Sequence, residues 1–384
     1  MIAEPPTRPS LATVLREWGR IGCIGFGGPP SHISLLRDLV VRRRSWLSER
    51  DFEDALAACN LLPGPASTQL AIYCAWRVRG RAAALVGAVG FIVPGLVLIL
   101  GLAALFLSSA PPRWVLGAGA GAGAAVAAVA VHAGWGLVPG SWARARGRRR
   151  VRWLAYGTAG AAAAATLGPW LVVVLLGCGL IELTLQRGAA ITSAPVLAPL
   201  FATAGTGGLG ALAWVAFKVG ALSYGGGFVI IPLMQADAVD RFHWMTGGQF
   251  LNAVALGQVT PGPVVQTVAV VGYAAAGVGG GLLAALVAFT PSLAFILAGG
   301  RRFDAVRSDT KARAFLDGAG PAAIGAILGA AIPLARALEE PWQYGVLAGA
   351  AVALLLLRRG VVATLLLAGF VGTVVALAGG PVPH

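Results

Sequence analysis

Long runs of apolar residues, separated by short polar segments, dominate the hydropathy pattern of this chain. The run from Ala82 to Ser108 is longer than the roughly 20 residues that cross a lipid bilayer. Each half of the chain contains six apolar stretches: 11–28, 53–76, 82–108, 114–138, 153–167 and 169–186, then 206–231, 250–276, 279–299, 317–337, 342–357 and 360–379. This pattern predicts an all-α polytopic membrane protein.

Two of these stretches carry the same break. Residues 59–71 read CNLLPGPASTQLA, and residues 257–269 read GQVTPGPVVQTVA. Proline has no backbone N–H and clashes with the preceding helical turn, whereas it suits the first position of a new helix. We therefore expect each PGP triplet to end one helix and to start another, near Pro65 and near Pro263. The alternative is that each triplet only kinks a continuous packed helix.

The two breaks belong to a longer internal repeat. With Pro63 aligned to Pro261, the two halves match without a gap at the following pairs: Gly22 and Gly220, Phe26 and Tyr224, Gly27 and Gly225, Gly28 and Gly226, Trp46 and Trp244, Phe52 and Phe250. Chance would not keep rare tryptophan, phenylalanine and PGP positions in one frame, so we predict an internal duplication. The expected organisation is a repeat over 1–187, a connection over 188–205 and a second repeat over 206–384.

Basic residues gather in the polar segments between the apolar stretches. The chain has 29 lysines and arginines against 15 acidic residues, for a formal net charge of +14. Segments such as RARGRRRVR, residues 144–152, follow the positive-inside rule for cytoplasmic loops, so we do not expect nucleic acid as a partner. The arginine-rich loops fall at opposite positions in the two halves, which predicts broken-helix repeats of inverted topology.

The segment before the first PGP triplet does not fit a simple crossing. Residues 37–50 contain five arginines, which a single crossing of the next stretch would place outside the cell. If the PGP segment instead dips into the bilayer and returns, these arginines stay on the cytoplasmic side. Non-helical backbone at that depth must be buried in protein or line a cavity. We favour this re-entrant arrangement.

The new helix starts predict a site for an anion. A helix N-terminus presents unpaired N–H groups and a partial positive charge, which attract negative ions. Polar side chains and flexible backbone lie on both sides of each break. The candidate binding residues are Asn60, Gly64, Ser67, Thr68, Gln69, Gln258, Thr260, Gly262, Gln266 and Thr267, and the breaks themselves are made by Pro63, Pro65, Pro261 and Pro263.

Two glycine runs, GFGGPPSH and SYGGGFVIIP, are expected to unwind helices near the same site. The glycines concerned are Gly27, Gly28, Gly225, Gly226 and Gly227. Glycine is also common where membrane helices pack closely, so packing is the alternative role.

Three ionisable residues extend the candidate site. Lys218 lies inside an apolar stretch at the position that matches Arg20, and ionisable groups within a membrane usually mark a transport pathway or a counter-ion. Both cations could instead extend to the membrane interface. His32 follows the first glycine run and is either a ligand for an anion or proton, or a polar core residue.

Other chemistry has little support in the sequence. The four cysteines lack metal-binding spacing, and there is no HExxH motif, nucleophile elbow or nucleotide fingerprint. Among the carboxylates, only Glu17 and Glu182 are expected within or near the ends of apolar stretches, so a relay of buried acids is not expected. We expect no catalytic residue, no metal and no cofactor, and therefore no enzyme.

At these residues the sequence resembles the chromate ion transporter family in its long two-domain form. The resemblance rests on GFGGPPSHI, WLSERDF and CNLLPGPASTQLAIY in the first half, and on KVGALSYGGGFVIIPL and WMTGGQFLNAVALGQVTPGPV in the second. It covers essentially the whole chain, with one departure at Tyr224, where Phe is usual. The resemblance implies a multi-pass protein of the bacterial cytoplasmic (inner) membrane that exports chromate, and thereby confers chromate resistance.

The substrate class fits the candidate residues. Chromate and sulfate are tetrahedral dianions of similar size, so helix starts, amides, hydroxyls and cations could hold either. We expect a secondary transporter, with chromate or sulfate and the lipid bilayer as partners and a homodimer as one option for assembly. The alternatives are a transporter of sulfate or another anion with the same fold and, with less support, a channel or a membrane-embedded enzyme.

Overall fold

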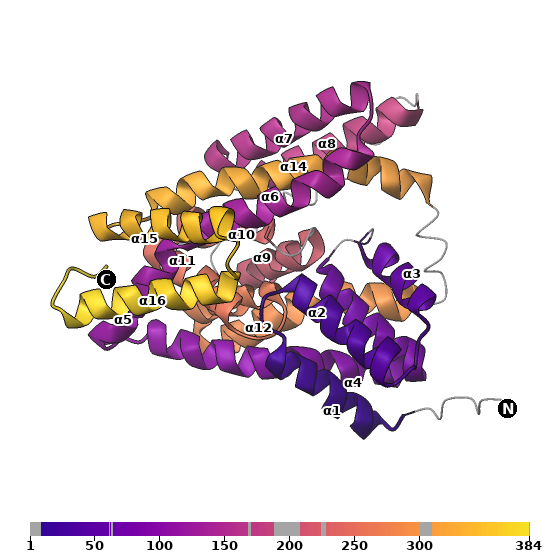
Figure 1. The fold of residues 1–384 in the computed structure, drawn as a ribbon, viewed down its shortest axis with the longest axis horizontal. Coiled ribbons are helices and arrows are strands. Elements are labelled where there is room, and N and C mark those ends of the chain that lie inside the picture. Colours follow the sequence, from indigo (N-terminus) through magenta and orange to yellow (C-terminus); the bar gives the residue numbers. More distant parts are fainter. Residues whose placement is uncertain are drawn as a thin grey trace.

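The computed structural model describes residues 9–60, 62, 64–167, 170–187, 208–223, 228–299 and 309–383, and these form helices and connecting turns without any strand (Figure 1). The first-half elements are α1 (Leu11–Ile24), α2 (Pro29–Arg37), η1 (Asp38–Arg43), α3 (Glu49–Cys59), α4 (Ala66–Phe106), α5 (Arg113–Ala124), α6 (Val126–Arg144), α7 (Arg148–Thr166) and α8 (Leu171–Arg187). The second-half elements are α9 (Leu209–Leu222), α10 (Ile230–Gln235), η5 (Ala236–Arg241), α11 (Gly247–Val259), η6 (Val264–Gln266), α12 (Thr267–Gly299), α14 (Thr310–Arg336), α15 (Pro341–Ala351), η7 (Val352–Leu356) and α16 (Val361–Leu377). The predicted all-α fold is confirmed.

Several elements recur at the offset that aligns the PGP triplets. Helices α1 and α9 begin and end 198 residues apart, and so do the π-helical turns η1 and η5. The caps recur as well: the Ser48 side chain accepts a hydrogen bond from the amide of Asp51, and the Thr246 side chain accepts one from the amide of Gln249. Each cap satisfies an otherwise unpaired donor, which fixes where α3 and α11 begin.

Helix α4 consists of two antiparallel arms, 66–78 and 81–106. Between them Arg79 and Gly80 leave the helical conformation, and Gly80 has φ +76°. A Cβ built on Gly87 would lie 2.6 Å from the Cβ of Ala75, so the two arms pack directly against each other. Helix α12 is divided in the same way at Ala276 and Gly277.

Helix α3 and the first arm of α4 form a hairpin that enters and leaves at the same end. Nη2 of Arg77, at the end of that arm, lies 3.4 Å from Oδ1 of Asp51, in the first turn of α3. Gly64 and Pro65 of the first PGP triplet therefore lie at the tip of the hairpin, between α3 and the first arm of α4. The re-entrant path through a bilayer expected from the sequence stays a prediction. The apolar stretch 53–76 is thus not one continuous crossing.

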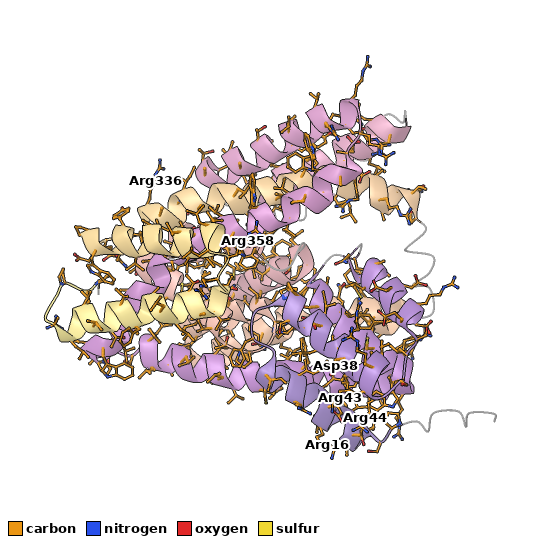
Figure 2. All side chains as sticks on the ribbon, viewed as in Figure 1. Arg16, Asp38, Arg43, Arg44, Arg336 and Arg358 are labelled. Carbon is orange, nitrogen blue, oxygen red and sulfur yellow. The ribbon has the colours of Figure 1, made fainter. Side chains whose placement is uncertain are left out.

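The start of α1 and the end of α2 lie at the base of this hairpin. Nη1 of Arg79 donates a 2.8 Å hydrogen bond to the carbonyl of Pro9, and Nη1 of Arg37 lies 3.0 Å from Oε1 of Glu49. Figure 2 shows Arg43 and Arg44 on this same side of the molecule. Arg37, Arg43 and Arg44 therefore lie around one end of the first half.

The later helices of each half pack mainly against helices of the other half. Helix α5 packs mainly against α16 of the second half, whereas α14 packs mainly against α7 and α8 of the first (Figure 1). Small residues make these contacts close: a Cβ on Gly117 would overlap the carbonyl of Gly372, and one on Gly325 would overlap that of Gly157. Such backbone approach is typical of helix packing in membranes.

Length and composition identify four helices able to cross a membrane: Ala66–Phe106, Arg113–Arg144, Val264–Gly299 and Thr310–Arg336. Shorter apolar helices accompany them. Large apolar side chains such as Val97, Leu286 and Phe370 are about two-thirds exposed, which suits contact with lipid rather than water. The chain is a multi-pass membrane protein.

Candidate functional site

The helix breaks of the two halves meet in the interior. The amide of Gly262, in the second PGP triplet, donates a 3.0 Å hydrogen bond to the carbonyl of Gly25, in the first glycine run. A Cβ on Gly28 would lie 3.5 Å from Cγ2 of Val264, at the helix start that follows. Two breaks far apart in the sequence therefore form one region of irregular backbone, where peptide groups are free of helical hydrogen bonds.

The first PGP triplet ends α3 and allows α4 to begin at Ala66, as predicted, with Pro65 as its N-cap. Gly64 has φ +118°, a conformation that side-chain-bearing residues rarely adopt. A Cβ there would lie 2.7 Å from Nε2 of Gln69 and 3.0 Å from Oγ of Ser292. The glycine is required both for the backbone turn and for the close approach of these polar groups.

The second PGP triplet has a corresponding geometry. Gly262 has φ +99°, Pro263 caps the short helix η6, and a Cβ on Gly262 would lie 3.2 Å from the side-chain amide of Gln266. Nε2 of Gln266 donates a 2.7 Å hydrogen bond to the carbonyl of Ile92 in α4. Each PGP glycine thus lies beside a buried glutamine from the helix start that follows it.

His32 connects the first glycine run to the first PGP helix start. Its side chain is fully buried, with Nε2 2.9 Å from the carbonyl of Gly25 and Nδ1 3.4 Å from Oγ of Ser67. Because a carbonyl only accepts, Nε2 carries a proton, and neutral Nδ1 accepts from the serine hydroxyl. The ring therefore joins the two regions but offers no free donor to an anion.

Several buried polar atoms near the breaks have no hydrogen-bond partner among the described residues. They are Oγ1 of Thr68, Oγ of Ser223, Nε2 of Gln258, Oε1 of Gln266 and Oγ of Ser292. Buried polar groups in folded proteins are nearly always paired, so these unpaired groups are candidates for binding water, an ion or a ligand. All but Oε1 of Gln266 can donate, which is what an oxyanion requires.

The remaining predicted site residues differ in whether they could contact a bound anion. The hydroxyls of Thr260 and Thr267 already donate to the carbonyls of Leu256 and Val264. Arg20 is exposed and lies outside the break region's buried polar cluster. Asn60 is exposed as well, but it lines the cavity described below.

Lys218 is buried as expected, but it is not an unpaired cation. Its Nζ lies 2.5 Å from Oδ2 of Asp237, whose side chain is only 2% exposed. The prediction that only Glu17 and Glu182 lie among apolar elements is therefore wrong. The helix does not end at Gln235 but continues through η5, and this extra turn buries Asp237.

A partly open cavity of about 830 Å³ reaches the first PGP triplet. Asn60, Leu62 and Gly64 line its inner wall, together with residues of α6, α10 and α14. Arg144, Arg149 and Arg313 line it as well, and Asp317 is its one acidic lining residue. A cavity of this kind concentrates anions from solution, because its cations act within low-dielectric walls.

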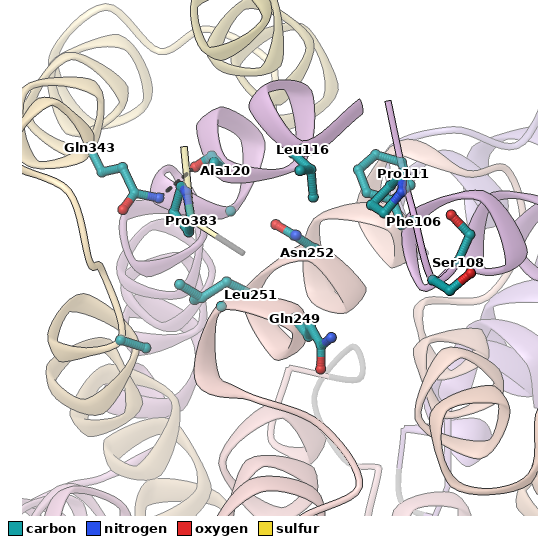
Figure 3. A pocket seen from close by; sticks show the side chains of 14 residues that line it. Phe106, Ser108, Pro111, Leu116, Ala120, Gln249, Leu251, Asn252, Gln343 and Pro383 are labelled. Carbon is teal, nitrogen blue, oxygen red and sulfur yellow. Dashed lines mark hydrogen bonds between the residues drawn. The ribbon is translucent and has the colours of Figure 1, made fainter. Parts of the chain in front are cut away.

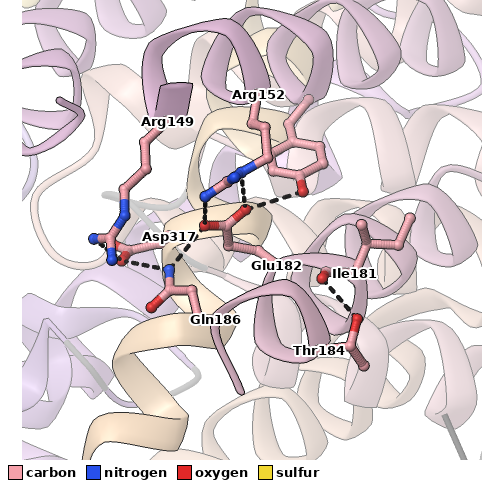
Figure 4. Close-up of polar contacts among 8 residues, drawn as sticks. Arg149, Arg152, Ile181, Glu182, Thr184, Gln186 and Asp317 are labelled. Carbon is pink, nitrogen blue, oxygen red and sulfur yellow. Dashed lines mark hydrogen bonds and ion pairs between the residues drawn. The ribbon is translucent and has the colours of Figure 1, made fainter. Parts of the chain in front are cut away.

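Next to this cavity, an ion-pair cluster joins the two halves (Figure 4). Glu182 of α8 accepts a 2.9 Å hydrogen bond from Nη2 of Arg152 and a 3.1 Å hydrogen bond from the Tyr156 hydroxyl. The Gln186 side chain bridges Glu182 and Asp317 of α14, at 2.8 and 3.3 Å. The predicted intramembrane acid Glu182 is therefore fully engaged in holding α7, α8 and α14 together.

A second pocket, of about 210 Å³, lies between α5 and α11 (Figure 3). Its polar lining includes Gln249, Asn252 and Gln343, and no lining residue is charged. In Figure 1, α11 lies toward the opposite end of the long axis from α3. The larger, cationic cavity is thus found beside the first-half break, and a smaller, uncharged pocket is found toward the other end.

Some predicted residues fall outside the described part of the chain: Pro63, Gly225, Gly226, Gly227 and the connection 188–205. Two serines with free hydroxyls were not predicted. Ser223 immediately precedes the second glycine run, and Ser292 follows Pro291 in the TPS motif that matches VPG of the first half. Both serines lie next to motifs that recur in the internal repeat, and this position could have identified them as candidate site residues. In the described residues, no three His, Cys, Asp or Glu side chains are placed to bind a metal ion.

Apolar helices that are broken at paired, polar and buried positions define a membrane transport protein of the broken-helix type. The sequence pattern of the family described as "Chromate transporter" matches residues 12–183 and 210–373. The chain belongs to the chromate transporter family, so the resemblance noted from its motifs is confirmed.

Individual relatives agree with this assignment. The chromate transport protein of Cupriavidus metallidurans is 30% identical over 94% of this chain and 91% of its own. That of Pseudomonas aeruginosa is 31% identical over 88% and 84%, and a probable chromate transport protein of Synechococcus elongatus is 28% identical over 85% of each. These relatives are named as transport proteins, which points away from an enzyme. No solved structure matches the chain.

Proposed function

We propose that this protein is a secondary transporter that exports chromate from the cytoplasm across the bacterial inner membrane and so confers chromate resistance. The observation that carries the proposal is the arginine-lined cavity, which ends at Asn60 and Gly64 beside buried donors that lack partners. The names of the relatives support chromate as the substrate.

The residues around the break suit a tetrahedral dianion. Four acceptor oxygens need donors from several directions, and the hydroxyls of Thr68 and Ser292 and the amide of Gln258 are buried and available. The start of α4 adds backbone N–H groups and a partial positive charge. Hydrogen bonds to a charged acceptor are about twice as strong as neutral ones, so a few such donors suffice.

Alternating access follows from the repeated architecture. We propose that the halves have opposite orientations in the membrane, because their breaks touch at Gly25 and Gly262 while α3 and α11 lie toward different ends. The larger cavity lies on the arginine-rich side, so the described conformation corresponds to a cytoplasm-facing state. Movement of one half against the other would close this cavity and open the opposite side.

Transport into proteoliposomes tests the proposal. The purified protein should move chromate, and exchange of labelled anion should be accelerated by anion on the opposite side, as expected of a carrier and not of a channel. Sulfate is the second arm, because it has the same shape and charge. Uptake of neutral solutes without either anion would contradict an oxyanion transporter.

A survival and accumulation assay in a chromate-sensitive host tests the direction. Cells that express the protein should accumulate less chromate than cells with an empty vector. Ser292→Ala and Gln258→Ala should lose this protection at equal expression, whereas Ser109→Ala, in the uncharged pocket, should keep it. Greater accumulation with the wild-type protein would indicate import instead of export.

A further inference from the structure

Lys218 and Asp237 form an ion pair deep inside the second half. Nζ of Lys218 lies 2.5 Å from Oδ2 of Asp237, and the two side chains are 9% and 2% exposed. Oδ2 of this carboxylate is therefore paired with the ammonium, whereas Oδ1 is buried and accepts no hydrogen bond among the described residues.

The pair joins the helical segments on either side of the second glycine run. Lys218 lies in α9, which ends just before Ser223, and Asp237 lies in η5, which continues α10. The ion pair thus ties α9 to the segment formed by α10 and η5. A change in the charge of either side chain would change how these two segments are held.

The first half shows that the fold does not need this pair. At the position that matches Asp237 stands Leu39, which is 2% exposed, and at the position that matches Lys218 stands Arg20, which is exposed. Helix α1 and η1 are nevertheless formed with the same lengths as α9 and η5. A buried ion pair is weak support for stability. The first half joins the corresponding elements by a different pair, Glu17 of α1 with Arg44 after η1, so the Lys218–Asp237 pair is distinguished by the buried Oδ1 of Asp237 that accepts no hydrogen bond among the described residues.

We propose that the Lys218–Asp237 pair is the binding site of the coupling proton, and that Oδ1 of Asp237 is the atom that takes it. This inference rests on the proposed transport of an oxyanion and deepens it by naming the ion that accompanies the substrate. The step is a simple protonation: an O–H bond forms at the carboxylate, the carboxyl group becomes neutral, and the Lys218 ammonium keeps its charge.

The ligand chemistry selects a proton over a metal cation. Sodium and other hard cations need several oxygen ligands, whereas the nearest group to this carboxylate is an ammonium that repels them. A proton needs only one lone pair. Oδ1 offers one, and the adjacent buried carboxyl environment is the kind that marks proton pathways in membrane proteins.

Few other charges face the pair. Nη1 of Arg241, one turn along η5, lies 3.9 Å from Oδ1 of Asp237, too far for a hydrogen bond, and its side chain is 36% exposed. Asp240 lies on the same turn, and Tyr273 is the one titratable side chain of the described α12. Helices α10 and α11, which also pack here, carry none. Lys218 is therefore the nearest charged group to Asp237, and Arg241 is the next.

This arrangement couples the proton to the anion. Protonation changes the pair from neutral to a net positive charge, which is costly in a low-dielectric interior unless a negative charge is nearby. An oxyanion bound at the breaks supplies that charge, so each ligand favours binding of the other, and the effect is reciprocal. Proton and dianion should bind together and leave together, with a net negative charge still moving outward.

Proton uptake during anion binding is the test. Sulfate is added to the purified protein in weakly buffered solution with a pH indicator, while calorimetry records binding; sulfate is chosen because it stays a dianion at neutral pH. If only chromate binds, it is used in alkaline solution, where it too carries no proton. The wild type should take up a proton with each anion, and Asp237→Asn should lose this uptake per anion bound.

Glu17→Gln is the matched control, because Glu17 pairs with Arg44 between α1 and the residue after η1, with the arginine 38% exposed. It should take up protons as the wild type does. Equal uptake in Asp237→Asn, or loss in Glu17→Gln alone, would overturn the inference. Binding without proton uptake in the wild type would overturn it while leaving oxyanion transport intact. Absence of both binding and transport would instead remove the proposed function.

The wild type alone decides the matter if Asp237→Asn does not fold. Infrared difference spectra with and without anion should show the carbonyl band of a newly protonated carboxylic acid. If the anion binds and no such band appears, Asp237 does not take the proton and the inference is wrong.

Discussion

The amide of Gly262 donates a hydrogen bond to the carbonyl of Gly25, although the two residues belong to different halves of the chain. The contact joins a PGP break to a glycine break, and not one PGP triplet to the other. Two of the three nearest neighbours of Gly64 are likewise from the other half, since its Cβ would approach Ser292 and the carbonyl of Gly220 as well as Gln69. Each PGP glycine therefore lies against the other half, and changes at either one should affect movement between the halves.

Gly64→Ala should abolish transport. The substitution places a Cβ at φ +118° and within 3.0 Å of Oγ of Ser292, so it strains the backbone and displaces a proposed ligand. Gly80→Ala is the control, because Gly80 also has positive φ but a Cβ there meets nothing within 4 Å. Both should cost about 1 kcal/mol of backbone strain, and only Gly64→Ala should lose chromate transport in proteoliposomes. Equal loss in both would assign the effect to strain alone.

Arg144→Ala should raise the KM for the oxyanion several-fold. This arginine lines the large cavity, where it increases the local anion concentration. The increase in KM should shrink as ionic strength rises, because salt screens the attraction. Arg113→Ala removes the same charge from the start of α5, outside the cavity, and should leave KM unchanged. A salt-independent effect would mean that Arg144 acts by packing.

Trp18→Phe should destabilise the first half. The buried indole Nε1 donates a 2.8 Å hydrogen bond to the carbonyl of Ala71, which holds α1 against the first arm of α4. Its loss removes one buried hydrogen bond between the two helices, at a cost of about 0.5–1.5 kcal/mol. The thermal midpoint of the detergent-solubilised protein should fall, whereas Trp114→Phe, at a residue that is 49% exposed, should leave it almost unchanged.

Glu182→Gln should destabilise the interface between the halves. The carboxylate is 3% exposed and holds Arg152, Tyr156 and Gln186 together, so removing its charge weakens three contacts at once. We expect a loss of about 2 kcal/mol, read as a lower thermal midpoint. Glu53→Gln, whose side chain is 49% exposed in a surface pair with Arg37, should change stability by less than about 0.5 kcal/mol. If both variants lost the same amount of stability, burial of the Glu182 contacts would make no extra contribution to stability.

Local chemistry made the helix breaks predictable. Proline and positive-φ glycine act within a few residues, so the helix starts after Pro65 and Pro263 could be placed from the sequence. The 198-residue register placed matched elements as well, because duplicated sequences keep their element lengths. The arginines of residues 37–50 indicated that the first hairpin enters and returns at the same end.

Contacts between distant segments could not be predicted in this way. Nothing in the residues around Asp237 shows that it faces Lys218, because that contact depends on how η5 packs against α9. The unpaired hydroxyl of Ser292 could be recognised as a candidate ligand only once α12 was seen to lie beside Gly64. Both relationships belong to the tertiary structure, since neither pair of residues is adjacent along one helix.

The exchange of α5 and α16 has a consequence for biosynthesis. Gly117 packs against Gly372, close to the end of the chain, so the face of α5 stays uncovered until nearly the whole protein has been made. The first half therefore cannot complete its own packing as it leaves the ribosome. Until α16 is made, the small-residue face of α5 is in contact with lipid. A chain truncated before α16 would stay incompletely packed, and membrane proteases can recognise such a chain.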